Sequence, residues 1–100
     1  LLVTIKRLVL TGRYAFSEKA RLEMDADGLT ELDVVEAIVN AVAIHKRLRS
    51  TSSPRSRRRE YLYVIQGTNL AGLAIYTKGK IARQHDDDIY YFLVSSMRSD

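Results

Sequence analysis

The chain has 100 residues, which suits a single domain over residues 1–100 and is short for two. It contains no cysteine, which excludes a disulfide framework, a thiolate zinc site and cysteine catalysis, and which fits a reducing compartment. No apolar run approaches the roughly 20 residues of a membrane-spanning helix, so we expect a cytoplasmic protein without a membrane partner. The net charge is +4, and seven basic residues gather between Lys46 and Glu60. This local excess indicates a polyanionic partner more strongly than the total does.

Two short helices are expected at the start of the chain. Apolar residues recur at helical spacing between Leu2 and Val9, and Gly12 stands where a helix would stop. A strand over the same opening residues is the main alternative, because several of them are β-branched. The second helix begins after Ser17, a good N-cap, and ends at Gly28. Its apolar side is narrow, which predicts a helix at the surface.

The strongest helical pattern follows Thr30, an N-cap with acidic residues in the turn behind it. Its apolar positions cover most of the circumference: a stripe of Leu32, Val35, Val39 and Val42, widened by Val34, Ile38 and Ala41. A helix of this kind is buried, and we expect it to pack against a sheet. The pattern predicts that it continues to Lys46 and Arg47, whose charge suits the C-terminal end of a helix.

Strands are expected after a basic, serine-rich loop. Residues 1–48 form the helical part of the prediction, residues 49–60 the loop, and residues 61–97 an antiparallel meander. The predicted strands and their links are Tyr61–Gln66, a turn at Gly67–Asn69, Leu70–Thr77 with an end or a bulge at Lys78–Lys80, and Ile89–Ser96. The predicted fold class is therefore α+β, with N-terminal helices packed on a small C-terminal antiparallel sheet.

Aromatic residues concentrate on the predicted strands, where six of the eight lie between Tyr61 and Phe92. A period of two places Tyr61 and Tyr63 on one face of their strand, and Tyr76 and Lys78 on one face of theirs. Tyrosines and lysines beside an arginine loop supply what single-stranded RNA requires, since bases stack on rings and phosphates pair with cations. The alternatives are that the tyrosines fill the rim of a β core and that the loop is only solvated.

Common enzyme signatures are absent from the sequence, including a phosphate loop, a dinucleotide glycine pattern and a helical histidine pair for zinc. His85 precedes Asp86, Asp87 and Asp88, whose carboxylates could hold magnesium, but a solvated turn is the better interpretation. We therefore expect neither a metal nor a cofactor.

Short segments in both halves of the chain follow one another in an order and at a spacing that are familiar from one family. They are Ile5–Val9 with Gly12, Ser17–Met24, Asp33–Ile38, Ile44–Lys46, Leu48–Thr51, Ile75–Gly79 and Phe92–Ser96. Through these segments the chain resembles, over nearly its whole length, the toxin family named MqsR. Each segment is short, so the resemblance rests on their order.

The resemblance implies a RelE-like fold and activity as an mRNA interferase, an endoribonuclease that cuts mRNA, free or on the ribosome, without a metal. It also implies a cognate antitoxin as partner, often one with a DNA-binding domain. Lys46, at the end of the long helix, and Tyr76, in the middle strand, match positions that act in MqsR-like toxins. Met97 stands where these toxins typically carry a lysine, and this departure weakens the expected phosphate site.

Metal-free RNA cleavage needs groups that accept the ribose 2′-hydroxyl proton, neutralise charge on the phosphorane and protonate the leaving oxygen. Tyr76 is the candidate for proton transfer, with Lys78 as its neighbouring cation. The candidate contacts to phosphates and bases are Lys46, Arg49, Arg55, Arg57, Arg58, Arg59 and Tyr63. Two other functions stay open: a non-catalytic RNA- or DNA-binding module, and a protein-interaction partner whose sheet edge pairs with another chain.

Overall fold

The computed structural model describes residues 1–49, 60–84 and 88–99, which form three helices and one five-stranded sheet. The helices are α1 (Leu2–Leu10), α2 (Glu18–Asp27) and α3 (Glu31–Asn40). The strands are β1 (Tyr14–Phe16), β2 (Lys46–Arg49), β3 (Tyr61–Thr68), β4 (Ala74–Arg83) and β5 (Ile89–Arg98). The predicted α+β class is confirmed. Within the described ranges, no helix has the length and apolar character needed to cross a membrane.

The first two helices begin and end at the predicted signals. α1 forms in place of the alternative strand, because helical spacing puts Ile5, Leu8 and Val9 together in the core. The chain then turns at Gly12, whose φ of 78° few other residues tolerate. In α2 the Ser17 hydroxyl oxygen accepts a hydrogen bond from the Ala20 backbone N–H at 3.0 Å. Its opposite end is closed by Gly28 in the left-handed conformation.

α3 begins at the predicted cap but buries a different side from the predicted stripe. The Thr30 hydroxyl and the Asp33 carboxylate form a reciprocal capping box. Leu32 is 64% exposed, whereas Val34 and Ile38 are fully buried. The choice of stripe was wrong because apolar positions cover most of the circumference, so the sequence alone does not select the side that meets the sheet. The predicted packing of this helix against a sheet is confirmed.

The prediction that α3 continues to Lys46 is also wrong, since the helix ends at Asn40. Ala41 leaves the helical conformation with a ψ of 141°, and the Asn40 side chain donates a hydrogen bond to the Thr68 carbonyl at 2.9 Å. Val42, part of the predicted stripe, is 96% exposed in the link that follows. Release from the helix lets Lys46–Arg49 pair with β3 as an edge strand. The predicted helical part, residues 1–48, therefore contains β1 between its first two helices and most of β2 at its end.

The sheet has the strand order β1-β5-β4-β3-β2 and is mixed. β2, β3, β4 and β5 pair antiparallel, as the predicted meander requires. The short strand β1 pairs parallel with β5, with Ala15 opposite Phe92, so a purely antiparallel sheet was the wrong expectation. The three residues of β1 are too few to show the alternating pattern that predicts a strand. Their pairing partners in β5 lie more than seventy residues away in sequence.

The strand ends differ from the prediction around the first turn. Gly67 and Thr68 belong to β3, and β4 starts only at Ala74, after an exposed tip that includes Leu70. A Cβ atom at Gly67 would lie 1.9 Å from the carbonyl oxygen of Ala37, so glycine there allows α3 to approach the sheet. The predicted bulge is present as a shift of the β4–β5 register between Lys78 and Gly79.

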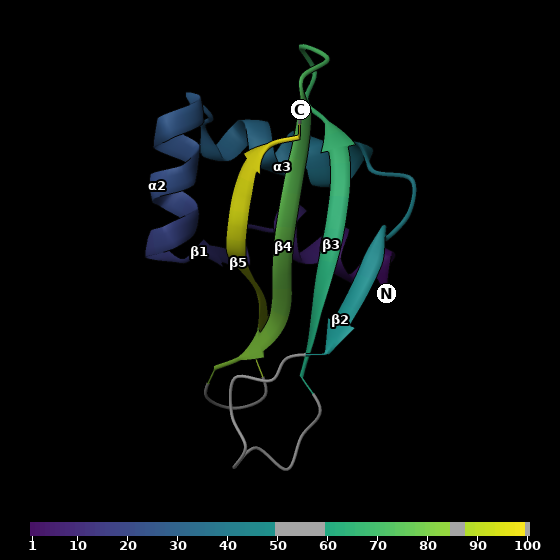
Figure 1. Ribbon diagram of the computed structural model, residues 1–100. Helices are drawn as coiled ribbons and strands as arrows, with labels where there is room; N and C mark the ends of the chain where they lie inside the picture. The colour runs from purple at the N-terminus through teal and green to yellow at the C-terminus, as the bar shows by residue number, and fades with distance from the viewer. Residues whose placement is uncertain (50–59, 85–87, 100) are drawn as a thin grey trace.

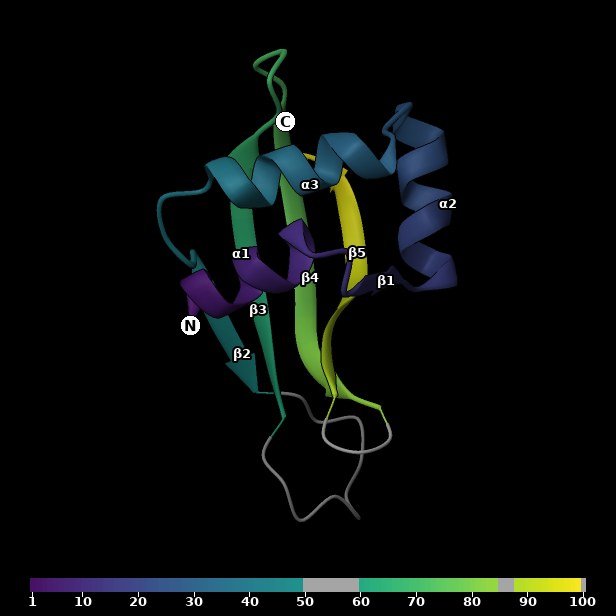
Figure 2. The same ribbon diagram turned by 180° about the vertical axis from the view of Figure 1, so that it is seen from behind.

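The sheet has one covered face and one open face. α1 and α3 cross the covered face, seen in Figure 2, while α2 stands beside β5 at the edge of the sheet (Figures 1 and 2). Side chains that point to the covered face include Ile65, Ile75 and Leu93, which are almost fully buried in the core. The open face, towards the viewer in Figure 1, carries no described helix. The predicted site residues are divided between these two faces.

Candidate functional site

The register of β4 and β5 brings four polar or functional positions together on the open face. Tyr76 is the cross-strand partner of Met97, and Lys78 is the partner of Ser95. Residues opposite one another in an antiparallel pair point to the same side of the sheet, with Cβ atoms about 4.5–5.5 Å apart. Tyr76 and Lys78 therefore lie next to the position where the resemblance leads one to expect a lysine, and that position holds Met97.

Lys46 reaches the same face from a strand and not from a helix end. It pairs with Val64 of β3, which pairs in turn with Lys78 of β4, so one row across the sheet runs Lys46, Val64, Lys78, Ser95. Val64 is only 2% exposed although it is outside the core cluster, which fits a valine covered by the stems of the flanking lysines. Lys46 and Lys78 thus lie on the open face of the sheet, two strands apart.

Tyr76, Lys78 and Met97 line a hollow of about 570 Å³, which we call the Tyr76 hollow. Its described lining is completed by one residue of α2 and by the end of β5 with the residue that follows: Lys19, Ser95, Arg98 and Ser99. Lys46 is not part of the lining, although it shares the face. Three cations and no carboxylate line the hollow within the described chain, so it suits an anion.

The side chains of Tyr76 and Lys78 have no hydrogen bond or ion pair with any described residue. The same holds, among the residues the structure describes, for Lys46 on its exposed edge strand. Side chains that are not engaged internally keep their donors available to a ligand, and they lose no internal contact when they turn towards one.

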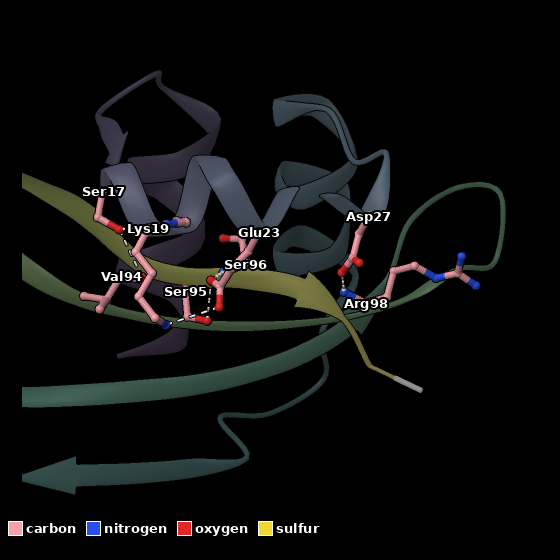
Figure 3. Close-up of polar contacts among 9 residues, drawn as sticks. Ser17, Lys19, Glu23, Asp27, Val94, Ser95, Ser96 and Arg98 are labelled. Carbon is pink, nitrogen blue, oxygen red and sulfur yellow. Dashed lines mark hydrogen bonds and ion pairs between the residues drawn. The ribbon is translucent and has the colours of Figure 1, made fainter. Parts of the chain in front are cut away.

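α2 closes the edge of β5 beyond the residues that pair with the short strand β1, and Figure 3 shows the polar contacts between α2 and this edge. The Glu23 carboxylate accepts hydrogen bonds from the Ser95 hydroxyl at 2.8 Å and from the Ser96 backbone N–H at 3.2 Å. The Asp27 carboxylate accepts from the Arg98 backbone N–H at 2.8 Å. Carboxylates of a helix thus take the place of the carbonyl groups of a further strand, which protects an edge that would otherwise be open to pairing.

Glu23 also connects this edge to the Tyr76 hollow. Burial alone would raise the pKa of its carboxyl, but hydrogen bonds from Ser95, Lys19 and the Ser96 backbone outweigh it and hold the pKa below its usual value. The same carboxylate fixes Ser95 and lies 3.2 Å from the Lys19 ammonium, and both of these residues line the hollow. The sequence analysis missed Glu23, Lys19 and Ser95, because only the packing of α2 against β5 places them here.

Tyr63 and Arg49, two predicted RNA contacts, do not share the face of Tyr76. Tyr63 pairs with Gly79, points to the covered face and is 9% exposed, so it belongs to the core. Arg49 pairs with Tyr61 and lies on the same side of the sheet as Tyr63, at the exposed edge. The expectation that the tyrosines of β3 share a sheet face with Tyr76 and Lys78 was wrong, because the β3–β4 register sets Tyr63 opposite Gly79, an inward position of β4, and Tyr61 points to the same side as Tyr63.

The remaining predicted contacts lie outside the described residues. They are the loop arginines Arg55, Arg57, Arg58 and Arg59. The structure therefore places Tyr76, Lys78 and Met97 around one hollow, Lys46 on the same face, and Tyr63 and Arg49 on the other side.

Comparison with protein-family models, with curated proteins and with solved structures finds no match for this chain.

Proposed function

We propose that this chain is a metal-independent endoribonuclease, the toxin of a bacterial toxin–antitoxin pair, with the RelE-like arrangement of helices on a sheet. The observation that carries the proposal is the pairing of Tyr76 with Met97 and of Lys78 with Ser95 around one cationic hollow on the open face. The resemblance to MqsR-like toxins selects Tyr76 and position 97 of this set from the sequence alone.

In the proposed reaction the ribose 2′-hydroxyl attacks the adjacent phosphorus, and the bond from phosphorus to the 5′-oxygen breaks. The products are a 2′,3′-cyclic phosphate and a free 5′-hydroxyl. Tyr76 is the group of the hollow that can exchange a proton with the reacting oxygens, and Lys78 stabilises the charge that develops on the phosphorane. Lys46, in the row of Lys78 on the same face, holds a neighbouring phosphate of the strand.

Because Met97 stands where a lysine is expected, cleavage of RNA by this chain should be slow. A thioether opposite Tyr76 offers no charge to a phosphate, and loss of one donor that stabilises a transition state commonly lowers a rate by about a hundredfold or more. The same observation favours a second candidate function, a non-catalytic module that binds single-stranded RNA or DNA on the open face.

Incubation with a long single-stranded RNA in EDTA separates the two functions. The endoribonuclease proposal expects slow cleavage by the natural chain, faster cleavage by Met97→Lys, and fragments that end in cyclic phosphate. Binding without cleavage by both proteins, on free RNA and on translating ribosomes, would leave the binding module as the function.

The partner proposal is tested in cells. A toxin arrests growth when it is expressed alone, and co-expression of the neighbouring gene product relieves the arrest when that product is the antitoxin. Growth arrest by Met97→Lys and its loss in Met97→Lys with Tyr76→Phe would tie the effect to the Tyr76 hollow. Normal growth with both the natural chain and Met97→Lys would contradict the toxin assignment.

A further inference from the structure

The sheet divides into two ribbons at the end opposite the β3–β4 turn. The register of β3 with β4 stops at Tyr63 opposite Gly79. Beyond this point the first residues of β3 pair only with β2, where Tyr61 is opposite Arg49, and the last residues of β4 pair only with β5, where Arg83 is opposite Ile89. Figure 1 shows the ends of β3 and β4 separating below the centre of the sheet. We call this opening the ribbon split.

A hollow of about 610 Å³ occupies the ribbon split. It is lined from both ribbons, mainly by rings and by cations: Tyr61, Tyr63, Tyr90, Phe92, Lys80 and Arg83. The volume lies within the range of sites that hold small organic ligands. Residues from the covered and the open sides of the strands meet in it, which a continuous sheet would not allow.

The aromatic rings at this hollow are partly exposed, and contacts with neighbouring side chains restrict their orientation. Tyr61 and Phe92 are half-buried, on opposite ribbons, and Phe92 packs edge to face with Tyr90 at 6.4 Å between ring centroids. The Arg47 guanidinium lies 4.4 Å from the centre of the Tyr61 ring, a contact that orients the ring. Half-buried rings held by neighbours are suited to stacking on a planar ligand, because little side-chain freedom remains to be lost.

Charge at the ribbon split favours an anionic ligand. Lys80 is 30% exposed and its ammonium lies 3.5 Å from the Glu60 carboxylate, which is 46% exposed. An ion pair this open to solvent contributes little to stability, so a phosphate can replace Glu60 as the partner of Lys80 at small cost. In the described part of the lining, Lys80 and Arg83 are the cations and Glu60 is the carboxylate.

We propose that the ribbon split binds one base of a single-stranded RNA, with the adjacent phosphate on Lys80. The assignment of the polymer as RNA rests on the proposed function. The open side of β4 joins the two hollows, since Tyr76, Lys78 and Lys80 alternate along it. At about 3.3 Å per residue Tyr76 and Lys80 are some 13 Å apart, a span of about two nucleotides in an extended strand. The ribbon split therefore determines which base stands about two nucleotides from the phosphate at Tyr76.

The site is located by NMR titration with the four ribonucleoside monophosphates as probes. We expect the backbone amide signals of Leu62, Ile81 and Ala82 to shift on binding, and the amides of α3, which crosses the sheet near the β3–β4 turn, to stay unchanged. Shifts confined to the Tyr76 hollow, or no saturable shift with any of the four nucleotides, would overturn the assignment.

Ring variants test the stacking with a short single-stranded RNA, measured by fluorescence anisotropy. Tyr61→Leu and Phe92→Leu should each weaken binding about tenfold, since stacking of a base on an aromatic side chain contributes about 1–3 kcal/mol. Tyr61→Phe keeps the ring and should bind like the natural chain. Val3→Ala, at an exposed position of α1, is the matched control for loss of apolar area. Equal affinity of the Leu variants and the natural chain would contradict the proposal.

The two proposals fail separately. RNA binding that depends on Tyr61 and Phe92 without any cleavage, even by Met97→Lys, removes the endoribonuclease and keeps the base site. Cleavage that needs Tyr76 but has the same rate and base preference in Tyr61→Leu and Phe92→Leu removes the base site and keeps the endoribonuclease.

Discussion

Tyr76 and Met97 face each other across the central strand pair of the sheet, on the side that no described helix covers. Directly opposed side chains on one face are close enough to contact the same phosphate, so a substitution at either position should change the rate of RNA cleavage. The proposed chemistry therefore has its most direct test at this pair.

Met97→Lys should raise the rate of RNA cleavage by about a hundredfold, since it places an ammonium group beside the Tyr76 hydroxyl. Tyr76→Phe in that background should lower the rate by a similar factor and leave RNA affinity nearly unchanged. Cleavage of a labelled RNA in EDTA gives the rates, and anisotropy gives the affinities. Leu70→Lys adds the same charge at an exposed tip and should not increase cleavage. An equal gain from Leu70→Lys would show that net charge, and not the Tyr76 hollow, is responsible.

Lys46→Gln and Lys78→Gln should each flatten the salt dependence of RNA binding. Every phosphate contact on a single strand contributes about 0.7 to the slope of log affinity against log salt concentration. Arg7→Gln, at an exposed position of α1 on the other side of the sheet, removes one charge as a control and should leave the slope as it is. The variant with Arg57, Arg58 and Arg59 changed to alanine extends the series to the basic loop. Slopes that fall equally in all variants would favour a diffuse electrostatic attraction over an open-face site.

Local signals in the sequence predicted the parts of the fold that depend on neighbouring residues. Ser17 and Thr30 start α2 and α3 because their side chains cap the adjacent backbone, and Gly28 ends α2 because the left-handed conformation is needed there. The alternating β-formers of β3 and β5 likewise gave strands close to the observed ones.

The errors concern choices that only distant partners determine. Lys46 suits the end of a helix as well as an edge strand, and the pairing of β2 with β3 decides between them. Tyr61 and Tyr63 share a face, as their spacing requires, but the side of the sheet depends on the pairing of Tyr63 with Gly79. The hydrogen bonds between α2 and β5 could not be predicted from the sequence either, since Glu23 and Ser96 are 73 residues apart.

Gly67→Ala should destabilise the fold by about 3 kcal/mol, at the upper end of what overpacking costs, because the added methyl group collides with the Ala37 carbonyl of α3. Gly12→Ala is the comparison: nothing lies within 4 Å of its Cβ position, and only the backbone strain of a φ of 78° remains, roughly 1–2 kcal/mol. Urea unfolding followed by circular dichroism measures both. A Gly67 variant as stable as the Gly12 variant would mean that α3 can move away from β3 without loss.

Glu23→Gln should destabilise the protein at pH 7 by about 1.5–3 kcal/mol, the usual contribution of hydrogen bonds to a charged group, and should change its response to acid. The pKa of Glu23 is lower in the folded protein than its usual value of 4.5, because hydrogen bonds outweigh burial. The unfolded chain therefore binds the proton more readily, so this contribution is fully present above about pH 5 and is lost as the pH falls through the folded-state pKa.

The difference in unfolding free energy between the natural chain and Glu23→Gln should accordingly narrow as the pH falls from about 5 through the folded-state pKa of Glu23. Asp25→Asn removes an exposed carboxylate from the same helix and controls for the change in net charge. Urea unfolding at a series of pH values gives the comparison. A constant difference across this range would mean that the Glu23 carboxylate is not held by Ser95, Lys19 and the Ser96 backbone in solution, and that the edge of β5 is closed by the other contacts of α2.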